Sequence, residues 1–167
     1  ASLQSDNPHR RRSGVYQRGY LHAKEHAADA AKLLKDPDSS VRCHAAGALA
    51  EMGAREYVKE VRALLKDPGA SVQHTAINQL GRLKDPSSIE LIAPFLDHEN
   101  WMIKMDSGLA LARLGATQYA PKIVPLLTHE QELVRQRAVA ALGCMKARDY
   151  APQVAALLKD PNAQARA

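Results

Sequence analysis

Leucines at positions 34, 65, 96, 127 and 158 recur at a constant step of 31 residues, with no insertion between them. Five further apolar columns keep the same step. They contain Val41, Val72, Ile103 and Val134; Leu49, Leu80, Leu111 and Leu142; Met52, Leu83, Leu114 and Met145; Val61, Ile92, Ile123 and Val154; and Leu64, Phe95, Leu126 and Leu157. A fixed period of this length is typical of repeat proteins, in which each unit contacts mainly its neighbours. The chain must therefore fold as an array of similar units.

Each repeat contains two segments whose apolar spacing is helical. Val41, Ala45 and Leu49 follow one another at steps of four, which places them on one helix face. Gly53 suits a helix C-cap, and the Asp36-Pro37 pair ends the preceding helix. The first helix of each repeat, helix A, is expected at 39–52, 70–83, 101–114 and 132–145. The second, helix B, is expected at 55–66, 86–97, 117–128 and 148–159.

These helices predict an all-α fold, an α-solenoid of stacked antiparallel helical hairpins with about four full repeats. The repeat domain is expected over 20–167, with a half repeat at 20–34, full repeats at 35–66, 67–97, 98–128 and 129–159, and a truncated repeat at 160–167. The chain stops inside a fifth helix A, which indicates a fragment of a longer protein or an end covered by a partner. No apolar helix A precedes residue 20, so we expect residues 1–19 to be a polar, basic N-terminal arm.

Positive charge is concentrated at the N-terminus. Of the net charge of +5, residues 1–24 contribute five basic side chains against one acidic, and Arg10, Arg11 and Arg12 stand together. The remaining chain is nearly balanced, whereas a groove for nucleic acid would be uniformly basic. This distribution disfavours nucleic acid as a partner. The arm could meet phosphate, an anionic membrane or an acidic protein surface.

The recurring motif is Leu-Leu-Lys-Asp-Pro, then Val-Arg, an Ala-rich helix, Gly and Tyr-Ala-Pro-x-Val. It resembles HEAT repeats, and more narrowly the short HEAT-like repeats of the phycobilisome-lyase type, over about residues 33–167. The resemblance implies a HEAT-like superhelix. It does not imply one function, because the family includes scaffolds, adaptors, lyase subunits, a metal hydroxylase and DNA glycosylases.

The resemblance also implies a ladder of ion pairs between loop aspartates and helix A arginines. Its members would be Asp36, Asp67 and Asp160 with Arg42, Arg135 and Arg166. Two later repeats have His98 and His129 at the aspartate position, and one has Gln73 at the arginine position. We therefore expect the ladder to be interrupted in the middle of the array.

Two histidine patterns could suggest a metal. His22 and His26 fit the H-x-x-E-H pattern of inverted zinc peptidases, but no third ligand or roofed cleft accompanies them. His-Glu pairs at 98 and 129 resemble those of the HEAT-fold deoxyhypusine hydroxylase, yet they fall in loops rather than in helix A. No glycine-rich phosphate loop and no nucleophile with a positioned base is present. We expect no catalytic residue, no metal and no cofactor, and hence no enzyme.

The two cysteines bear on the cellular compartment. Cys43 and Cys144 lie three repeats apart, much farther than the Cα separation of about 7 Å that a disulfide allows. Free thiols fit a reducing compartment, so we expect an intracellular, cytoplasmic chain. No run of 18 apolar residues occurs, and no membrane span is expected.

The exposed face of helix B is the expected binding surface. In HEAT-like arrays the resemblance implies that helix B lines the concave side, and Val61 marks its buried face. At 100° per residue, positions 56 and 59 then face outward and position 62 flanks them. The outward columns carry mixed charge. We expect a protein partner, as a peptide or helix, to contact Glu56, Lys59, Arg62, Glu90, Lys122 and Gln153.

Two functions fit these observations. The first is a non-catalytic scaffold or adaptor that mediates protein–protein interaction, alone or within a larger complex. The alternative is an enzyme-associated HEAT subunit resembling the phycobilin lyases, in which a pocket would hold a tetrapyrrole.

Overall fold

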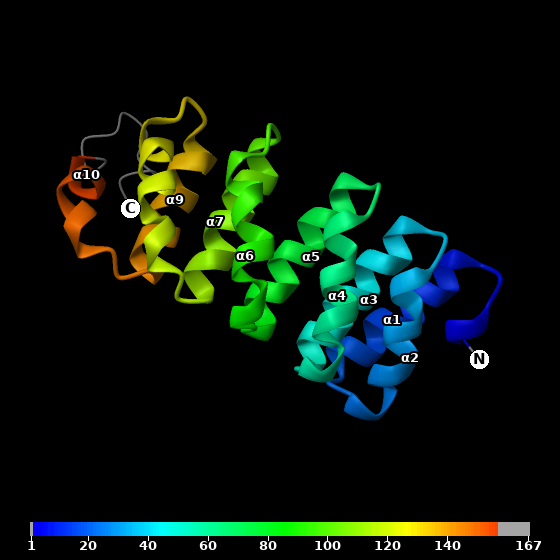
Figure 1. Cartoon of the computed structure of the whole chain (residues 1–167). Coiled ribbons are helices and arrows are strands. Elements are labelled where there is room, and N and C mark those ends of the chain that lie inside the picture. The colour runs from blue at the N-terminus through cyan, green and yellow to red at the C-terminus, as the bar shows by residue number, and fades with distance from the viewer. Residues whose placement is uncertain (1, 157–167) are drawn as a thin grey trace. The chain divides into compact units, whose positions relative to one another are not determined.

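The computed structural model describes residues 2–156 (Figure 1). The described residues form α- and 3₁₀-helices, with no strand among them. They divide into two compact units, residues 2–85 (unit 1) and 86–156 (unit 2). The boundary falls between helix A and helix B of the repeat expected at 67–97. The predicted all-α array of helical hairpins is confirmed.

The first unit contains three helices A, namely α1 (Pro8–Tyr20), α3 (Ser39–Met52) and α5 (Ala70–Leu83). Helix α3 packs against α1 on one side and α5 on the other. Each helix B is a short α-helix between 3₁₀ turns: η2 (Lys24–His26), α2 (Ala27–Lys32) and η3 (Leu33–Lys35), then η4 (Arg55–Tyr57), α4 (Val58–Ala63) and η5 (Leu64–Lys66). A short η1 (Ser2–Gln4) precedes α1.

The second unit repeats this pattern. Its helices A are α7 (Trp101–Arg113) and α9 (Glu132–Cys144), which pack against each other. Its helices B are η6 (Pro86–Ser88), α6 (Ile89–Ile92) and η7 (Ala93–Asp97), then η8 (Thr117–Tyr119), α8 (Ala120–Ile123) and η9 (Val124–Thr128), then η10 (Arg148–Tyr150) and α10 (Ala151–Ala156). The expected helix boundaries agree with these bounds to within one residue over the described range.

Side-chain oxygens start several helices A, and left-handed residues end them. Asp38 accepts hydrogen bonds from the N–H groups of Ser40 and Val41, at 2.9 and 3.1 Å, which satisfies two free donors of α3. After α3, Gly53 takes φ +64° and the N–H of Ala54 donates to the carbonyl of Leu49 at 2.9 Å. This bond closes a Schellman motif. The equivalent left-handed positions of the other repeats are His22, Lys84, Gly115 and Lys146.

The predicted apolar columns form the core of each unit. The valine and isoleucine column that begins at Val41 and the leucine column that begins at Leu49 are at most 2 % exposed throughout. Three columns are less regular than expected, because Phe95, Leu114, Leu126 and Val154 are only half-buried. Leu157 and Leu158 lie outside the described residues.

The N-terminal residues differ from the expected arm. Residues 8–20 form α1, Val15 is fully buried, and the side chain of Arg11 is held against Asp36 of the next loop. The basic segment Arg10, Arg11 and Arg12 is therefore part of a helix A that packs on the array. The prediction failed because Arg10 and Arg18 stand in the columns that other repeats fill with Val41 and Leu49.

A close helix contact holds α1 in place. A Cβ atom built on Gly19 would lie 2.7 Å from the Cα of Ala48 and 2.8 Å from its Cβ. Such distances are too short for any side chain, so the two helices approach at a pair of small residues. Gly47 precedes Ala48 in α3, and no atom lies within 4 Å of a Cβ atom built on Gly47.

Leu111 tests the core. Its side chain is fully buried in α7, and Leu111→Ala should lower the free energy of unfolding by about 2–5 kcal/mol in denaturant melts, since it removes packed methyl groups and leaves a cavity. Leu91 of α6 is 47 % exposed, so Leu91→Ala should cost less than about 0.5 kcal/mol. Equal losses in the two variants would show that the column is not core.

Gly19 tests the docking of α1. Gly19→Ala should destabilise the chain by about 1–3 kcal/mol, because the new methyl group meets backbone atoms of α3. Gly47→Ala is the matched control in α3, and alanine should be neutral or stabilising there by up to about 1 kcal/mol. Amide hydrogen exchange across residues 8–20 locates the effect. Unchanged protection of α1 in the Gly19 variant would contradict the close packing.

Candidate interaction surface

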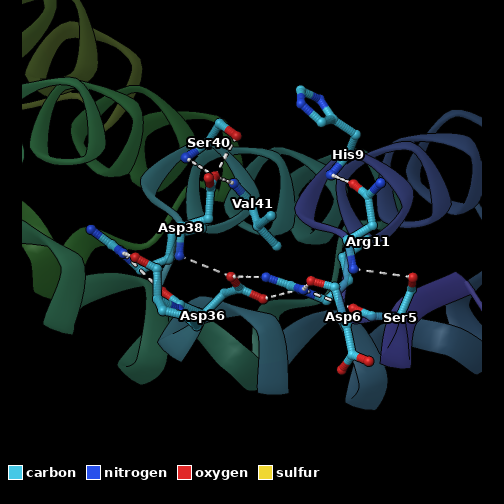
Figure 2. A network of polar contacts seen from close by, with 11 residues as sticks. Ser5, Asp6, His9, Arg11, Asp36, Asp38, Ser40 and Val41 are labelled. Atoms are coloured by element: carbon cyan, nitrogen blue, oxygen red, sulfur yellow. Dashed lines mark hydrogen bonds and ion pairs between the residues drawn. The ribbon is translucent and has the colours of Figure 1, made fainter.

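An arginine of each of the first two helices A joins two consecutive loops. Figure 2 shows the first of these links, in which Arg11 reaches from α1 to Asp36. Its Nε donates to one carboxylate oxygen at 2.6 Å and its Nη2 to the other at 2.8 Å, while its Nη1 donates to the carbonyls of Ser5 and Asp6. The Arg11 and Asp36 side chains are only 13 % and 4 % exposed. A bidentate pair of this kind fixes direction as well as distance.

Arg42 repeats this geometry one repeat later. Its Nε and Nη2 donate to the carboxylate of Asp67 at 2.8 and 2.9 Å, and its Nη1 donates to the carbonyls of Asp36 and Pro37. Each arginine thus binds the backbone of its own loop and the carboxylate of the next loop. The expected ladder exists, but it begins one repeat earlier than predicted, at Arg11.

The ladder changes where the sequence changes. The Nε2 of Gln73 donates to the carbonyl of Asp67 at 2.8 Å and so keeps only the bond to its own loop. Nδ1 of His98 and of His129 accepts a backbone N–H two residues on, at 2.9 and 3.1 Å, as a carboxylate oxygen of Asp36 does. Arg135 binds its own loop carbonyls. Asp160 and Arg166 lie outside the described residues.

The ladder carboxylates have lowered pKa values. The hydrogen bonds from Arg11 hold the pKa of Asp36 below its ordinary value, against the opposing effect of burial. Burial is the largest influence on Asp67 and raises its pKa, but the Arg42 and Gly69 hydrogen bonds together outweigh it and lower the pKa. Both side chains are therefore held as anions inside unit 1.

The predicted binding residues in unit 1 are placed on one helix B. Glu56 and Lys59 are exposed, and Arg62, one turn later on α4, is half-buried. Arg62 forms an ion pair with Asp85, in which its Nε donates to the carboxylate at 3.1 Å. The ion pair with Asp85 therefore holds the Arg62 side chain in place, whereas the charged groups of Glu56 and Lys59 are exposed to solvent.

Unit 2 contains the other three predicted residues, all exposed. The hydroxyl of Tyr119 donates a hydrogen bond to Glu90 at 3.1 Å, which links two neighbouring helices B. The Nζ of Lys122 lies 2.5 Å from a carboxylate oxygen of Asp97. Desolvation and the nearby Glu90 carboxylate raise the pKa of Tyr119. Gln153 lines an open hollow beside Pro125 and Leu127 of η9.

We use the term helix B face for the predicted binding residues on the helices B of each unit, which are Glu56, Lys59 and Arg62 in unit 1 and Glu90, Lys122 and Gln153 in unit 2. The structure places three of these residues in each unit. Sequence reasoning missed their partners Asp85, Asp97 and Tyr119, although each lies within one repeat length of the residue that it contacts. The two members of these pairs are 23, 25 and 29 residues apart, because each pair connects successive helices B or the loops beside them. A comparison of polar residues at such spacings could have identified the pairs.

The structure places the first histidine pattern across a turn, with His22 after α1 and His26 in η2. His22 does not share a helix face with His26, because it takes the left-handed turn position after α1, where its Nδ1 donates to the carbonyl of Glu51 at 2.6 Å. Nowhere in residues 2–156 do three or more His, Cys, Asp or Glu side chains gather as metal ligands would. Within the same residues, no helix combines the length and apolar character needed to span a bilayer.

The family follows from the repeat match. The family model for HEAT repeats matches residues 1–72, 27–111, 58–142 and 90–167. The chain belongs to the HEAT repeat family. The first of these matches includes α1, in agreement with its place in the array. No curated protein sequence matches the chain.

Solved structures with the same fold include a phycocyanin lyase complex and designed armadillo repeat proteins. The chain is similar to the complex of CpcE and CpcF of phycocyanin lyase from Nostoc sp. PCC7120, at 22% identity and a TM-score of 0.80, over 99% of this chain and 70% of that chain. A designed armadillo repeat protein matches at 18% identity and a TM-score of 0.62, over 99% and 92%. Another designed armadillo repeat protein, in complex with the peptide (KR)4, matches at 16% identity and a TM-score of 0.62. The match covers 99% of this chain and 92% of that chain. These likenesses confirm the repeat fold.

The ladder predicts how stability depends on pH. Because folding lowers the pKa of Asp36, its contribution is fully present above the ordinary aspartate value of about 3.9 and is lost as the pH falls through the folded value. Asp36→Asn should cost about 1–3 kcal/mol at pH 7, since the enclosed Arg11 loses its counter-charge. The variant should also lose less stability than the wild type between pH 5 and 2.

Denaturant melts at several pH values measure both effects. Glu60→Gln is the control, because Glu60 is exposed on α4 in the same unit, and it should change stability by less than about 0.5 kcal/mol. Parallel pH profiles for the Asp36 variant and the wild type would contradict the ionic role of this carboxylate.

Proposed function

We propose that this HEAT-repeat chain is a non-catalytic scaffold that binds a protein partner, as an extended peptide or a helix, along the helix B face. The observation that carries the proposal is the recurrence of exposed charged side chains on successive helices B. Glu56 and Lys59 stand on one of them, and Glu90 and Lys122 on two others. A partner with a complementary pattern of charge would be recognised by its register along the repeats.

The contacts within this face support a binding role. Lys122 is 48 % exposed although it is paired with Asp97, so its ammonium can exchange this weak surface contact for one with a partner. The Tyr119 hydroxyl holds Glu90 in a defined position. A side chain that is already ordered loses less conformational entropy when it binds.

The solved structures support the same reading. The designed armadillo repeat protein in complex with the peptide (KR)4 has this kind of repeat fold and holds a basic peptide. Carboxylates such as Glu56 and Glu90 would attract basic side chains of a partner, and Lys59 and Lys122 would attract its acidic side chains. The likeness to phycocyanin lyase concerns the fold alone at 22% identity, and association with a bilin lyase stays a prediction.

The test is a double charge reversal, Lys59→Glu with Lys122→Glu. A partner is first isolated by affinity capture on the full chain and identified by mass spectrometry, and its affinity is then measured by titration calorimetry. The double variant should bind at least about tenfold more weakly, which corresponds to about 1.4 kcal/mol. Its melting temperature should stay unchanged, because both residues are exposed.

A matched control separates the helix B face from net charge. Arg10→Glu with Lys84→Glu changes the charge equally at exposed positions outside helix B, and should leave the affinity within about twofold. Hydrogen exchange of the complex should show protection on the helices B. Protection confined to the helices A, or equal weakening by both double variants, would overturn the proposal.

A further inference from the structure

Exposed aromatic rings gather on the helix A layer of unit 1. Tyr16 and Tyr20 of α1 are 60 % and 73 % exposed, and their rings stack with centroids 6.5 Å apart. The ring of His44, from α3, meets Tyr16 edge to face at 6.1 Å. The chain has only five tyrosines, and two of them stand here with the histidine. Tyrosine is enriched at the energetic centres of protein interfaces.

Hydrogen-bond donors surround the first hollow beside these rings. It has a volume of about 370 Å³ and is lined by Arg12, Ser13, Tyr16, Gln17 and His44. None of these residues has a carboxylate. Nδ1 of His44 donates to the carbonyl of Ser40 at 2.7 Å, which leaves Nε2 available to a ligand. The structure gives the half-buried guanidinium of Arg12 no hydrogen bond or ion pair within residues 2–156.

A second hollow continues from the first across the tyrosine pair. It has a volume of about 290 Å³ and shares Tyr16 and His44 with its neighbour. Gly47 and Ala48 lie in its lining, and no atom comes within 4 Å of a Cβ built on Gly47. Small residues between exposed rings leave room for an apolar side chain. Glu51 also lines this hollow, but its carboxylate is paired with Arg82 at 2.7 Å.

Charge favours an acidic occupant. Helix α1 contains four arginines and no acidic residue. Arg11 is neutralised by Asp36, whereas Arg12 borders the first hollow. A short peptide can place a carboxylate at Arg12 and an apolar residue over the tyrosines.

We propose that the groove formed by Arg12, Tyr16, Tyr20, His44 and Gly47 binds an acidic peptide segment. A peptide carboxylate accepts hydrogen bonds from Arg12, and a proline or another apolar residue next to it packs on the tyrosine pair. Aromatic grooves of this kind accept proline-containing peptides because the extended backbone is already ordered. This groove lies in the helix A layer and does not depend on binding at the helix B face.

Two synthetic peptides of equal length test the groove on the full chain. Fluorescein-labelled (Glu-Pro)4 and (Lys-Pro)4 are titrated by fluorescence anisotropy, with labelled oligo-dT as a nucleic-acid probe. The acidic peptide should bind at least about tenfold more tightly than the basic peptide and than oligo-dT. In ¹⁵N-labelled protein, its chemical-shift changes should concentrate at residues 12–20 and 43–51.

Substitutions locate the site. Arg12→Glu and Tyr20→Ala should each lower the affinity for the acidic peptide by about tenfold or more. The first removes the counter-charge of the peptide carboxylate, and the second removes one ring of the tyrosine pair. Arg10→Glu changes the charge of the same helix at an exposed residue outside the groove. Its affinity for the acidic peptide should stay within about twofold of the wild-type value. Circular dichroism melts check folding, and Arg12→Gln replaces Arg12→Glu if the latter unfolds.

Three results would overturn the proposal. Equal weakening by the Arg10 and Arg12 variants would assign the binding to the general charge of α1. Equal affinity for oligo-dT would assign it to nucleic acid. Shift changes outside residues 12–20 and 43–51, or none at all at millimolar peptide, would remove the groove as the site.

Discussion

A helical hairpin of this chain has apolar side chains on two faces, and it can bury both only between two neighbours. Val61 and Leu49 illustrate the constraint, because each is fully buried although the hairpin that contains them is only two helices thick. The cohesion of the array therefore lies in the contacts between repeats. Each repeat is stable to the degree that the adjacent one is folded, which is the usual energetics of solenoid proteins.

Polar links add direction to this apolar packing. Apolar columns alone would tolerate small rotations of one repeat against the next, because hydrophobic contact has no preferred angle. A bidentate guanidinium does not tolerate them, since both of its N–H groups must meet the carboxylate plane. In unit 1, Arg11 and Arg42 make this link twice in the same geometry. In the loops that follow, histidine keeps the hydrogen bond that orders the loop.

The fold was largely predictable because one pattern repeats several times. Helix boundaries followed from the 31-residue step and from the turn residues such as Gly53 and Pro37. The apolar columns did not indicate the first helix, because α1 has Arg10 and Arg18 in two of them. The polar columns contained the missing signal, since Arg11 precedes Arg42, and Ser5 precedes Asp36, by one repeat.

The surface was less predictable. Helical phase gave the exposure of Glu56, Lys59 and Lys122, but it cannot give the partner of a side chain on another helix. The pairs formed by Arg62 with Asp85 and by Tyr119 with Glu90 depend on how neighbouring helices B are placed. The aromatic groove of unit 1 was hidden for the same reason, because His44 joins Tyr16 only after α1 packs on α3.

The turn that ends each helix A has a further meaning. All five of its left-handed positions have the same backbone conformation, but glycine occupies only two of them, Gly53 and Gly115. His22, Lys84 and Lys146 adopt it at a cost of about 1 kcal/mol or more, because their Cβ atoms crowd the following carbonyl. The hairpins thus alternate between relaxed and strained corners. A strained corner lowers the free energy needed to open its hairpin, so repeats of the same geometry are expected to differ in their thresholds for local unfolding.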